Sequence, residues 1–385
     1  MKICTLNKIA ACGTARFGAG YQVGEELQGA DGVLVRSAAM HDMALPESLL
    51  AIARAGAGVN NIPVEDCSAK GIVVFNTPGA NANAVKELVL AGLFLSSRRI
   101  VEGANWAQTL KGEGDAVGKL VEKGKSAFAG PELKGKKLGV IGLGAIGVLV
   151  ANSAVALGMD VYGYDPFLSV DAAWRLSRAV HHAATLEEIY AQCDYITVHV
   201  PLTADTTGML GKDAFAVMKD GVRILNFARA GLVDSKAMLA ALESGKVAAY
   251  VVDFPTAEML GVKNVLAIPH LGASTPESED NCAVMAADEL TDYLENGNIT
   301  HSVNFPDMKV ARSGDARICV LHKNVPNMLA QISAVVSAVG INIASMTNKS
   351  RKELAYTVLD IEGTAKEAVI RDILAIHDVI RVRLL

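Results

Sequence analysis

Three side chains that could carry out acid–base chemistry follow short apolar runs: Arg229, Glu258 and His270. Such runs are typical of buried parallel strands, whose ends gather at one edge of a sheet. An arginine fork binds a carboxylate and polarises a carbonyl. A histidine exchanges a hydroxyl proton near neutrality, and a carboxylate orients the imidazole. Singly, each residue also fits a surface charge or a turn, but their shared placement favours oxidation of a 2-hydroxy acid.

A glycine-rich turn predicts a binding site for the hydride-carrying cofactor that this chemistry needs. Gly142, Gly144 and Gly147 form G-x-G-x-x-G between an apolar run and an alanine-rich helical pattern. This context predicts a tight turn, close approach of the backbone to a pyrophosphate, and a helix N-terminus that faces the phosphates. Asp165 ends the next predicted strand, where a carboxylate binds the adenosine ribose hydroxyls and repels a 2′-phosphate. NAD is therefore the expected cofactor rather than NADP.

Composition excludes several other classes of protein. The chain has 385 residues, is 51% hydrophobic and carries a net charge of −5 with no basic block, so neither nucleic acid nor a membrane surface is an expected partner. The six cysteines are scattered and form no metal-ligand pattern, so we expect reduced thiols, no metal and a cytoplasmic protein. The first ten residues lack the apolar core of a secretory signal. The uncharged segment 139–159 has the glycines of a strand, turn and helix rather than of a bilayer span.

The order of elements predicts an α/β fold with three domains. Short apolar runs alternate with helical patterns up to about residue 284, which is typical of doubly wound parallel sheets. After a polar, linker-like stretch at 296–314, the pattern becomes βαββαβ, the order of a ferredoxin-like module. We expect an α/β block at 1–92, a Rossmann domain at 93–284, and a third domain at 313–385.

Several motifs in a fixed order carry a resemblance to a known family. They are RAGAGVNN at 54–61, NTPGAN at 76–81, the glycines at 142–147, HVPLT at 199–203, the segment 226–234, and PHLGAST at 269–275. With them the chain resembles the D-2-hydroxyacid dehydrogenases, most closely their phosphoglycerate dehydrogenase branch. The resemblance implies that the block at 1–92 is a flavodoxin-like substrate domain, completed by residues 285–312 with a returning helix near 285–310.

The same resemblance implies roles for individual residues. Arg229 would bind the substrate carboxylate and carbonyl, His270 would be the acid and base, and Glu258 its partner. The implied cofactor contacts, besides the three glycines and Asp165, are Ala145, Ile146, His199, Val200, Pro201, Thr206, Ala228, Asp253, Gly272 and Ala273. The implied substrate contacts are Arg36, Ser37, Arg54, Ala57, Gly58 and Val59, of which the two arginines would bind a phosphate.

The C-terminal module resembles an ACT domain, a regulatory fold that binds amino acids at paired interfaces. His322, Asn324 and Asn342 match the positions that hold L-serine in related enzymes, which implies serine as an effector and a homodimer or homotetramer. Asn327 stands where that motif usually has glycine, which puts the shape of this turn in doubt.

Three functions remain open at this point. The first is NAD-dependent oxidation of 3-phosphoglycerate and its reverse, the first step of L-serine synthesis. The second is reduction of an unphosphorylated 2-keto acid such as hydroxypyruvate, glyoxylate or pyruvate. The third is a catalytically silent sensor of NAD(H) or an amino acid, against which the intact Arg229, Glu258 and His270 argue.

Overall fold

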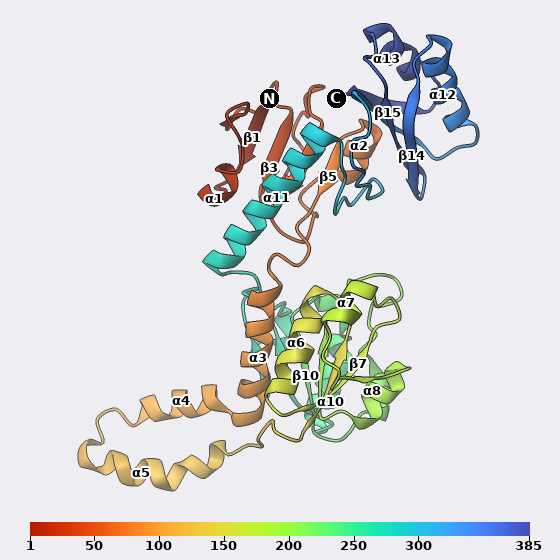
Figure 1. The fold of residues 1–385 in the computed structure, drawn as a ribbon. Helices are drawn as coiled ribbons and strands as arrows, with labels where there is room; N and C mark the ends of the chain where they lie inside the picture. Colours follow the sequence, from red (N-terminus) through yellow and green to blue (C-terminus); the bar gives the residue numbers. More distant parts are fainter. The chain divides into compact units, whose positions relative to one another are not determined.

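The computed structural model describes residues 1–385. The chain forms two compact units, one made of Met1–Asn81 with Pro276–Leu385 and the other of Ala82–Thr275. Figure 1 colours the chain along the sequence, so the first unit appears in red to orange and again in cyan to blue. No helix is both long enough and apolar enough to cross a bilayer.

A five-stranded parallel sheet forms the centre of the first unit, in the order β2-β1-β3-β4-β5. Its elements are β1 (Lys2–Leu6), α1 (Ala11–Thr14), β2 (Gln22–Gly24), β3 (Gly32–Val35), β4 (Ala51–Arg54), α2 (Val64–Ala69) and β5 (Val73–Phe75). The order turns back beside β1, which is the flavodoxin-like pattern that the sequence predicts. Strands β3 and β5 are buried along their whole length because both faces of the sheet are covered.

Helix α11 (Pro276–Asn296) covers one face of this sheet. It starts at a proline and carries two glutamates in its first turn, both favoured at a helix N-terminus. Gly297, with a φ of 70°, follows its last turn. The expected position of this helix, 285–310, is therefore wrong: these start and stop signals place it earlier in the chain.

The segment after α11 is irregular but packed. Ile299, Phe305 and Met308 are buried, and the Asn304 side chain accepts a hydrogen bond from the amide of Val74, 2.9 Å away. This segment, which the sequence suggests to be a linker, therefore belongs to the core of the first unit.

A four-stranded antiparallel sheet ends the first unit, in the order β14-β15-β13-β16. Its elements are β13 (Ala316–Lys323), α12 (Met328–Ala338), β14 (Ile343–Arg351), β15 (Leu354–Ile361), α13 (Glu367–Leu374) and β16 (Val379–Leu384). The βαββαβ order of the ferredoxin-like fold is confirmed. One face of this sheet packs on α12 and α13, where Ile318 and Ile332 belong to one cluster.

The other face of the antiparallel sheet joins the core around α11. Cys319, Leu321 and Tyr356 belong to the same buried cluster as Leu290 of α11 and Phe75 of β5. The core of the C-terminal module is therefore continuous with the core of the five-stranded parallel sheet.

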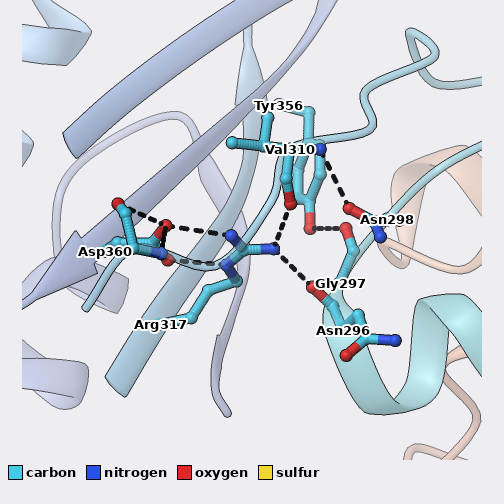
Figure 2. A network of polar contacts seen from close by, with 8 residues as sticks. Asn296, Gly297, Asn298, Val310, Arg317, Tyr356 and Asp360 are labelled. Atoms are coloured by element: carbon cyan, nitrogen blue, oxygen red, sulfur yellow. Dashed lines mark hydrogen bonds and ion pairs between the residues drawn. The ribbon is translucent and has the colours of Figure 1, made fainter. Parts of the chain in front are cut away.

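A buried ion pair lies at this junction (Figure 2). Arg317 donates to both carboxylate oxygens of Asp360, over 2.7 and 2.9 Å, and the two side chains are 1% and 0% exposed. Arg317 also donates to the carbonyls of Asn296 and Val310, and the Tyr356 hydroxyl donates to the carbonyl of Gly297. Burial disfavours ionisation of Asp360, but Arg317 outweighs it and holds the pKa of this carboxyl below its ordinary value.

The second unit is a doubly wound fold around a seven-stranded sheet, in the order β12-β11-β10-β9-β6-β7-β8. Its strands are β6 (Lys137–Ile141), β7 (Asp160–Tyr164), β8 (His181–His182), β9 (Tyr195–Val198), β10 (Val222–Asn226), β11 (Val247–Val252) and β12 (Val265–Ala267). Its main helices are α3 (Ala82–Arg98), α6 (Ala145–Ala156), α7 (Val170–Arg175), α8 (Leu186–Gln192), α9 (Lys212–Val217) and α10 (Ser235–Glu243). All strand pairs are parallel, as a Rossmann fold requires.

A helical arm that the sequence pattern did not predict follows α3. It consists of α4 (Ile100–Thr109), α5 (Val117–Gly124) and two 3₁₀ turns, Gly114–Ala116 and Lys125–Phe128. None of these four elements contains a buried residue. Trp106 packs on Phe128 with 5.3 Å between ring centroids, so side chains of the arm contact one another.

The expected domain limits at residues 92 and 284 fall inside α3 and α11, whereas the two compact units divide at the N-terminal ends of these helices. The division into three domains stays a prediction.

Candidate active site

The glycine turn lies between β6 and α6, where the sequence places it. Gly142 has a φ of 90°, and a Cβ atom there would lie 2.7 Å from the carbonyl oxygen of His199. A Cβ on Gly147 would lie 1.9 Å from the oxygen of Gly142, so helix and turn pack as closely as only glycine allows. A Cβ on Gly144 would meet nothing within 4 Å. The backbone there is open to a ligand, at the N-terminus of α6.

Asp165 follows β7 and is bound to this turn. Its carboxylate accepts hydrogen bonds from the amides of Leu143 and Phe167, each over 2.8 Å. These bonds fix the carboxylate beside the glycine loop and leave further lone pairs for ribose hydroxyls. The placement fits the expected role of Asp165 with NAD.

His199 follows β9, and Val200 and Pro201 come next in the chain. Its Nε2 lies 3.0 Å from the hydroxyl of Thr197, while Nδ1 is buried without a partner. Burial lowers the pKa of the His199 imidazole to about 4, so the ring is neutral at physiological pH. Thr206 donates to the carbonyl of Pro201 over 2.7 Å and shapes this loop.

Asp253 is the most unusual group in the second unit. It follows β11, is 1% exposed, and neither carboxylate oxygen has a hydrogen-bond partner. Burial raises the pKa of Asp253, although the nearby His270 and Arg229 act in the opposite direction. A buried acceptor without a donor is costly, so this position favours a ligand that brings an N–H group, such as a carboxamide. Gly272 lies against the carboxylate, because a Cβ there would be 3.1 Å from Oδ2.

Arg229 and His270 both lie close to one aromatic ring. The rings of His270 and Phe254 have centroids 4.2 Å apart, and the Arg229 guanidinium carbon lies 5.7 Å from the Phe254 centroid. Both polar side chains are exposed at the carboxyl ends of β10 and β12. The structure therefore brings Arg229 and His270 together, while their roles as carboxylate-binding cation and acid–base group stay predictions.

Buried Asn226 shapes the loop that carries Arg229. Its side chain donates to the carbonyl of Arg229 over 2.9 Å and accepts from the amide of Ala228 over 3.1 Å. The Arg229 guanidinium in turn donates to the carbonyl of Ala228 over 2.7 Å. Asn226 is thus a positioning residue for Arg229 and for the expected cofactor contact Ala228.

Glu258 is not joined to His270 in the structure. It is exposed on the 3₁₀ turn Ala257–Met259 and makes no hydrogen bond or ion pair. Its role as the partner of His270 stays a prediction. Ala273 is half-buried directly after Gly272, on the same loop as His270.

The expected substrate contacts of the first unit follow β3 and β4. Arg54 donates from Nε to the carbonyl of Arg36 over 3.0 Å, so the two arginines lie side by side. The Arg36 guanidinium is 2.5 Å from Oε1 of Glu279, on the first turn of α11. A Cβ on Gly56 would overlap the Arg54 guanidinium, which therefore folds over the substrate loop.

The neighbouring loops are fixed by two asparagines. Asn7 accepts from the amide of Ser37 over 3.1 Å, and Asn76 donates to the carbonyl of Ala57 over 2.6 Å. Gly58 and Val59 continue the loop and are not buried.

The residues expected to hold L-serine have partners inside the C-terminal module. His322 is 2% exposed, with Nδ1 2.7 Å from the carbonyl of Lys323 and Nε2 2.8 Å from the hydroxyl of Thr357. Asn324 donates to the carbonyl of Lys352 over 3.1 Å, and Asn342 is exposed. A ligand at His322 would have to replace one of these bonds.

Asn327 adopts the conformation that glycine would give. Its φ is 71° and its ψ is 3°, in the left-handed region that asparagine tolerates better than most residues. The turn that opens α12 is therefore formed despite the substitution.

Two residues of the candidate site were not predicted from the sequence. Phe254 contacts both Arg229 and His270, and the signal was an aromatic residue directly after the buried Asp253. Glu279 pairs with Arg36 from far along the chain, and no local pattern connects the two.

Comparisons with known proteins agree with this geometry. The class of protein is defined by a doubly wound domain that binds a nicotinamide dinucleotide. Its marks are the glycine turn, Asp165, and the buried Asp253 without a hydrogen-bond partner. Residues 90–272 match the family described as D-isomer specific 2-hydroxyacid dehydrogenase, NAD binding domain.

Two curated relatives carry one name. D-3-phosphoglycerate dehydrogenase of Rattus norvegicus is 39% identical over 72% of this chain and 51% of its own length. The protein of that name from Haemophilus influenzae is 31% identical over 85% of this chain and 79% of its own. A crystal structure of NAD⁺-bound 3-phosphoglycerate dehydrogenase in Entamoeba histolytica aligns with a TM-score of 0.61 at 28% identity, over 79% of this chain and 98% of that one.

The chain belongs to the D-isomer specific 2-hydroxyacid dehydrogenase family. It spans about half the length of the rat relative.

Proposed function

We propose that this chain oxidises 3-phosphoglycerate to 3-phosphohydroxypyruvate with NAD, and catalyses the reverse reaction, as the first step of L-serine synthesis. The observation that carries the proposal is the grouping of Arg229 and His270 around Phe254, beside the buried carboxylate of Asp253. The name shared by the relatives supports the choice of substrate.

Each group has one task in this proposal. NAD, when bound, accepts the hydride from C2 of the substrate and returns it in reduction. Arg229 binds the substrate carboxylate and polarises the carbonyl, and His270 takes up the hydroxyl proton in oxidation and returns it in reduction. Asp253 accepts a hydrogen bond from the nicotinamide carboxamide, and Glu258 reaches His270 once substrate is bound. Arg36 and Arg54 bind the phosphate.

The remaining assignments follow the same resemblance. The substrate domain, the NAD domain and an ACT domain divide the chain near residues 92, 284 and 312. L-serine binds the ACT domain as an effector of a cytoplasmic homo-oligomer. The exposed Ile100, Val101 and Val117 of the arm support self-association, since such side chains are often covered in oligomers.

The test is oxidation of NADH with 3-phosphohydroxypyruvate, hydroxypyruvate, glyoxylate and pyruvate, each with and without L-serine. We expect the phosphorylated acid to have the highest kcat/KM and serine to inhibit. Arg36→Ala should reduce kcat/KM for the phosphorylated acid about 10- to 100-fold, the worth of a charged hydrogen bond, and leave hydroxypyruvate nearly unchanged.

Arg16→Ala is the matched control, because Arg16 also pairs with an acid on α11, Asp288, at 2.6 Å. Equal loss with phosphorylated and unphosphorylated acids in the Arg36 variant would argue against a phosphate site. Preference of the unaltered protein for an unphosphorylated acid would assign it to a 2-keto acid reductase instead.

A further inference from the structure

In the Arg36–Arg54 pair of the first unit, Arg36 already forms an ion pair with a carboxylate of the protein itself. Arg36 Nη2 lies 2.5 Å from Glu279 Oε1, and the two side chains are 42% and 41% exposed. Arg54 is bonded to the backbone of Arg36. A negatively charged ligand that approached Arg36 would therefore meet Glu279 in direct competition.

The surroundings show that this pair is exchangeable. Half-exposed ion pairs are weak and form and break readily in water. Beneath the arginines, burial raises the pKa of the Cys282 thiol even though Thr77 and both arginines oppose this, so the thiol stays neutral. Glu279, rather than the thiol, therefore balances part of the positive charge here.

We propose that Glu279 is a displaceable counter-ion that sets the affinity of the Arg36–Arg54 site for phosphoryl groups. The inference rests on the proposed function, because it takes these arginines to be the phosphate site. In the free protein the carboxylate holds Arg36 in position. When a phosphorylated acid binds, its phosphate takes the place of Glu279 on the guanidinium, and the two anions repel each other.

The substitution Glu279→Gln separates the positioning of Arg36 from the repulsion between Glu279 and the phosphate. The amide oxygen still accepts a hydrogen bond from Arg36, so the guanidinium keeps its position, but the repulsion of a phosphate that carries about −1.5 to −2 charges is removed. We expect KM for 3-phosphohydroxypyruvate to fall about 3- to 10-fold. KM for hydroxypyruvate should change less than about twofold, because that acid has no group for this site.

Glu277→Gln is the matched control. It removes a carboxylate charge two residues earlier, in the same first turn of α11. Glu277 is exposed and has no ion-pair partner. Steady-state kinetics of the three proteins with both acids would be combined with ³¹P NMR titration of inorganic phosphate. The titration measures the affinity of the site for inorganic phosphate without any turnover.

Tighter binding of inorganic phosphate and a lower KM for the phosphorylated acid in Glu279→Gln alone support the proposal. Equal changes in both variants, no change, or a higher KM in Glu279→Gln would overturn it. If the unaltered protein reduces only unphosphorylated acids, the proposed function fails. The NMR titration then still decides whether Glu279 competes for the arginines.

Discussion

The buried ion pair Arg317–Asp360 offers a test of whether the C-terminal module is held to the rest of the first unit. The test is the substitution Asp360→Asn. In Asp360→Asn the side chain keeps its shape, but the guanidinium loses the carboxylate that it contacts twice. Arg317 is 1% exposed and cannot move into water without opening the junction with α11. Removing one partner of a buried pair costs about 3–5 kcal/mol, because the other charge is left uncompensated.

Two controls define what this loss means. Asp288→Asn breaks the exposed ion pair between Asp288 of α11 and Arg16, and should cost less than about 1 kcal/mol. The double change Arg317→Met with Asp360→Leu removes both charges and should cost less than Asp360→Asn alone.

The distribution of tryptophan provides the assay. Trp106 and Trp174, the chain's two tryptophans, both lie in the second unit. Trp174 is 83% exposed, so the change in fluorescence on unfolding comes from Trp106, which packs on Phe128, whereas circular dichroism follows both units. In urea, Asp360→Asn should lower the midpoint of the dichroism transition by about 1 M or more, with the fluorescence transition nearly unchanged. An unchanged dichroism midpoint would refute the reasoning that the pair holds the module in place.

Three further predictions concern single side chains. Burial, with Asp307 and Asp288 nearby, raises the pKa of Glu289 from 4.5 to about 9, and Oε1 of this carboxyl lies 2.6 Å from Nδ1 of His301. The folded state binds the proton of Glu289 more tightly than the unfolded state, so the free energy of unfolding falls as pH rises through this range. In Glu289→Gln the free energy of unfolding should therefore fall by about 1–3 kcal/mol less between about pH 5.5 and 8.5 than in the unaltered protein, measured by thermal unfolding. An equally steep pH dependence in the variant would count against this. His270→Gln should lower kcat about 10²- to 10⁴-fold with little change in the Kd of NADH, measured by fluorescence titration; retained turnover would exclude His270 as acid and base. Asp165→Ser should raise kcat/KM with NADPH relative to NADH, and an unchanged ratio would show that Asp165 does not select the cofactor.

Elements with a strong local signal could be predicted from the sequence. The glycines at 142–147 and Asp165 fix their own backbone geometry, so motif and structure agree. The alternation of apolar runs and helical patterns likewise predicted the parallel sheets and the βαββαβ module. These features depend on neighbours within about thirty residues.

Features that depend on distant contacts could not be predicted in this way. Glu279 meets Arg36 only after α11 has packed on the sheet, and Phe254 meets His270 only because parallel strands align their ends. The segment after Asn296 looked polar, yet the contacts of Asn304 place it in the core. The helical arm was missed because it interrupts the alternation of strands and helices on which the prediction rested, and because its helices bury no residue.

The discontinuity of the first unit has a consequence for synthesis of the chain. The first five strands leave the ribosome early, but α11, which covers them, follows only after Ala82–Thr275. At about 5–20 residues per second, this interval lasts about 10–40 s, during which the face carrying Leu34 and Phe75 has no cover. The second unit is continuous and can finish folding in that time. Nascent chains of this protein therefore need protection of the sheet β1–β5 until α11 has emerged.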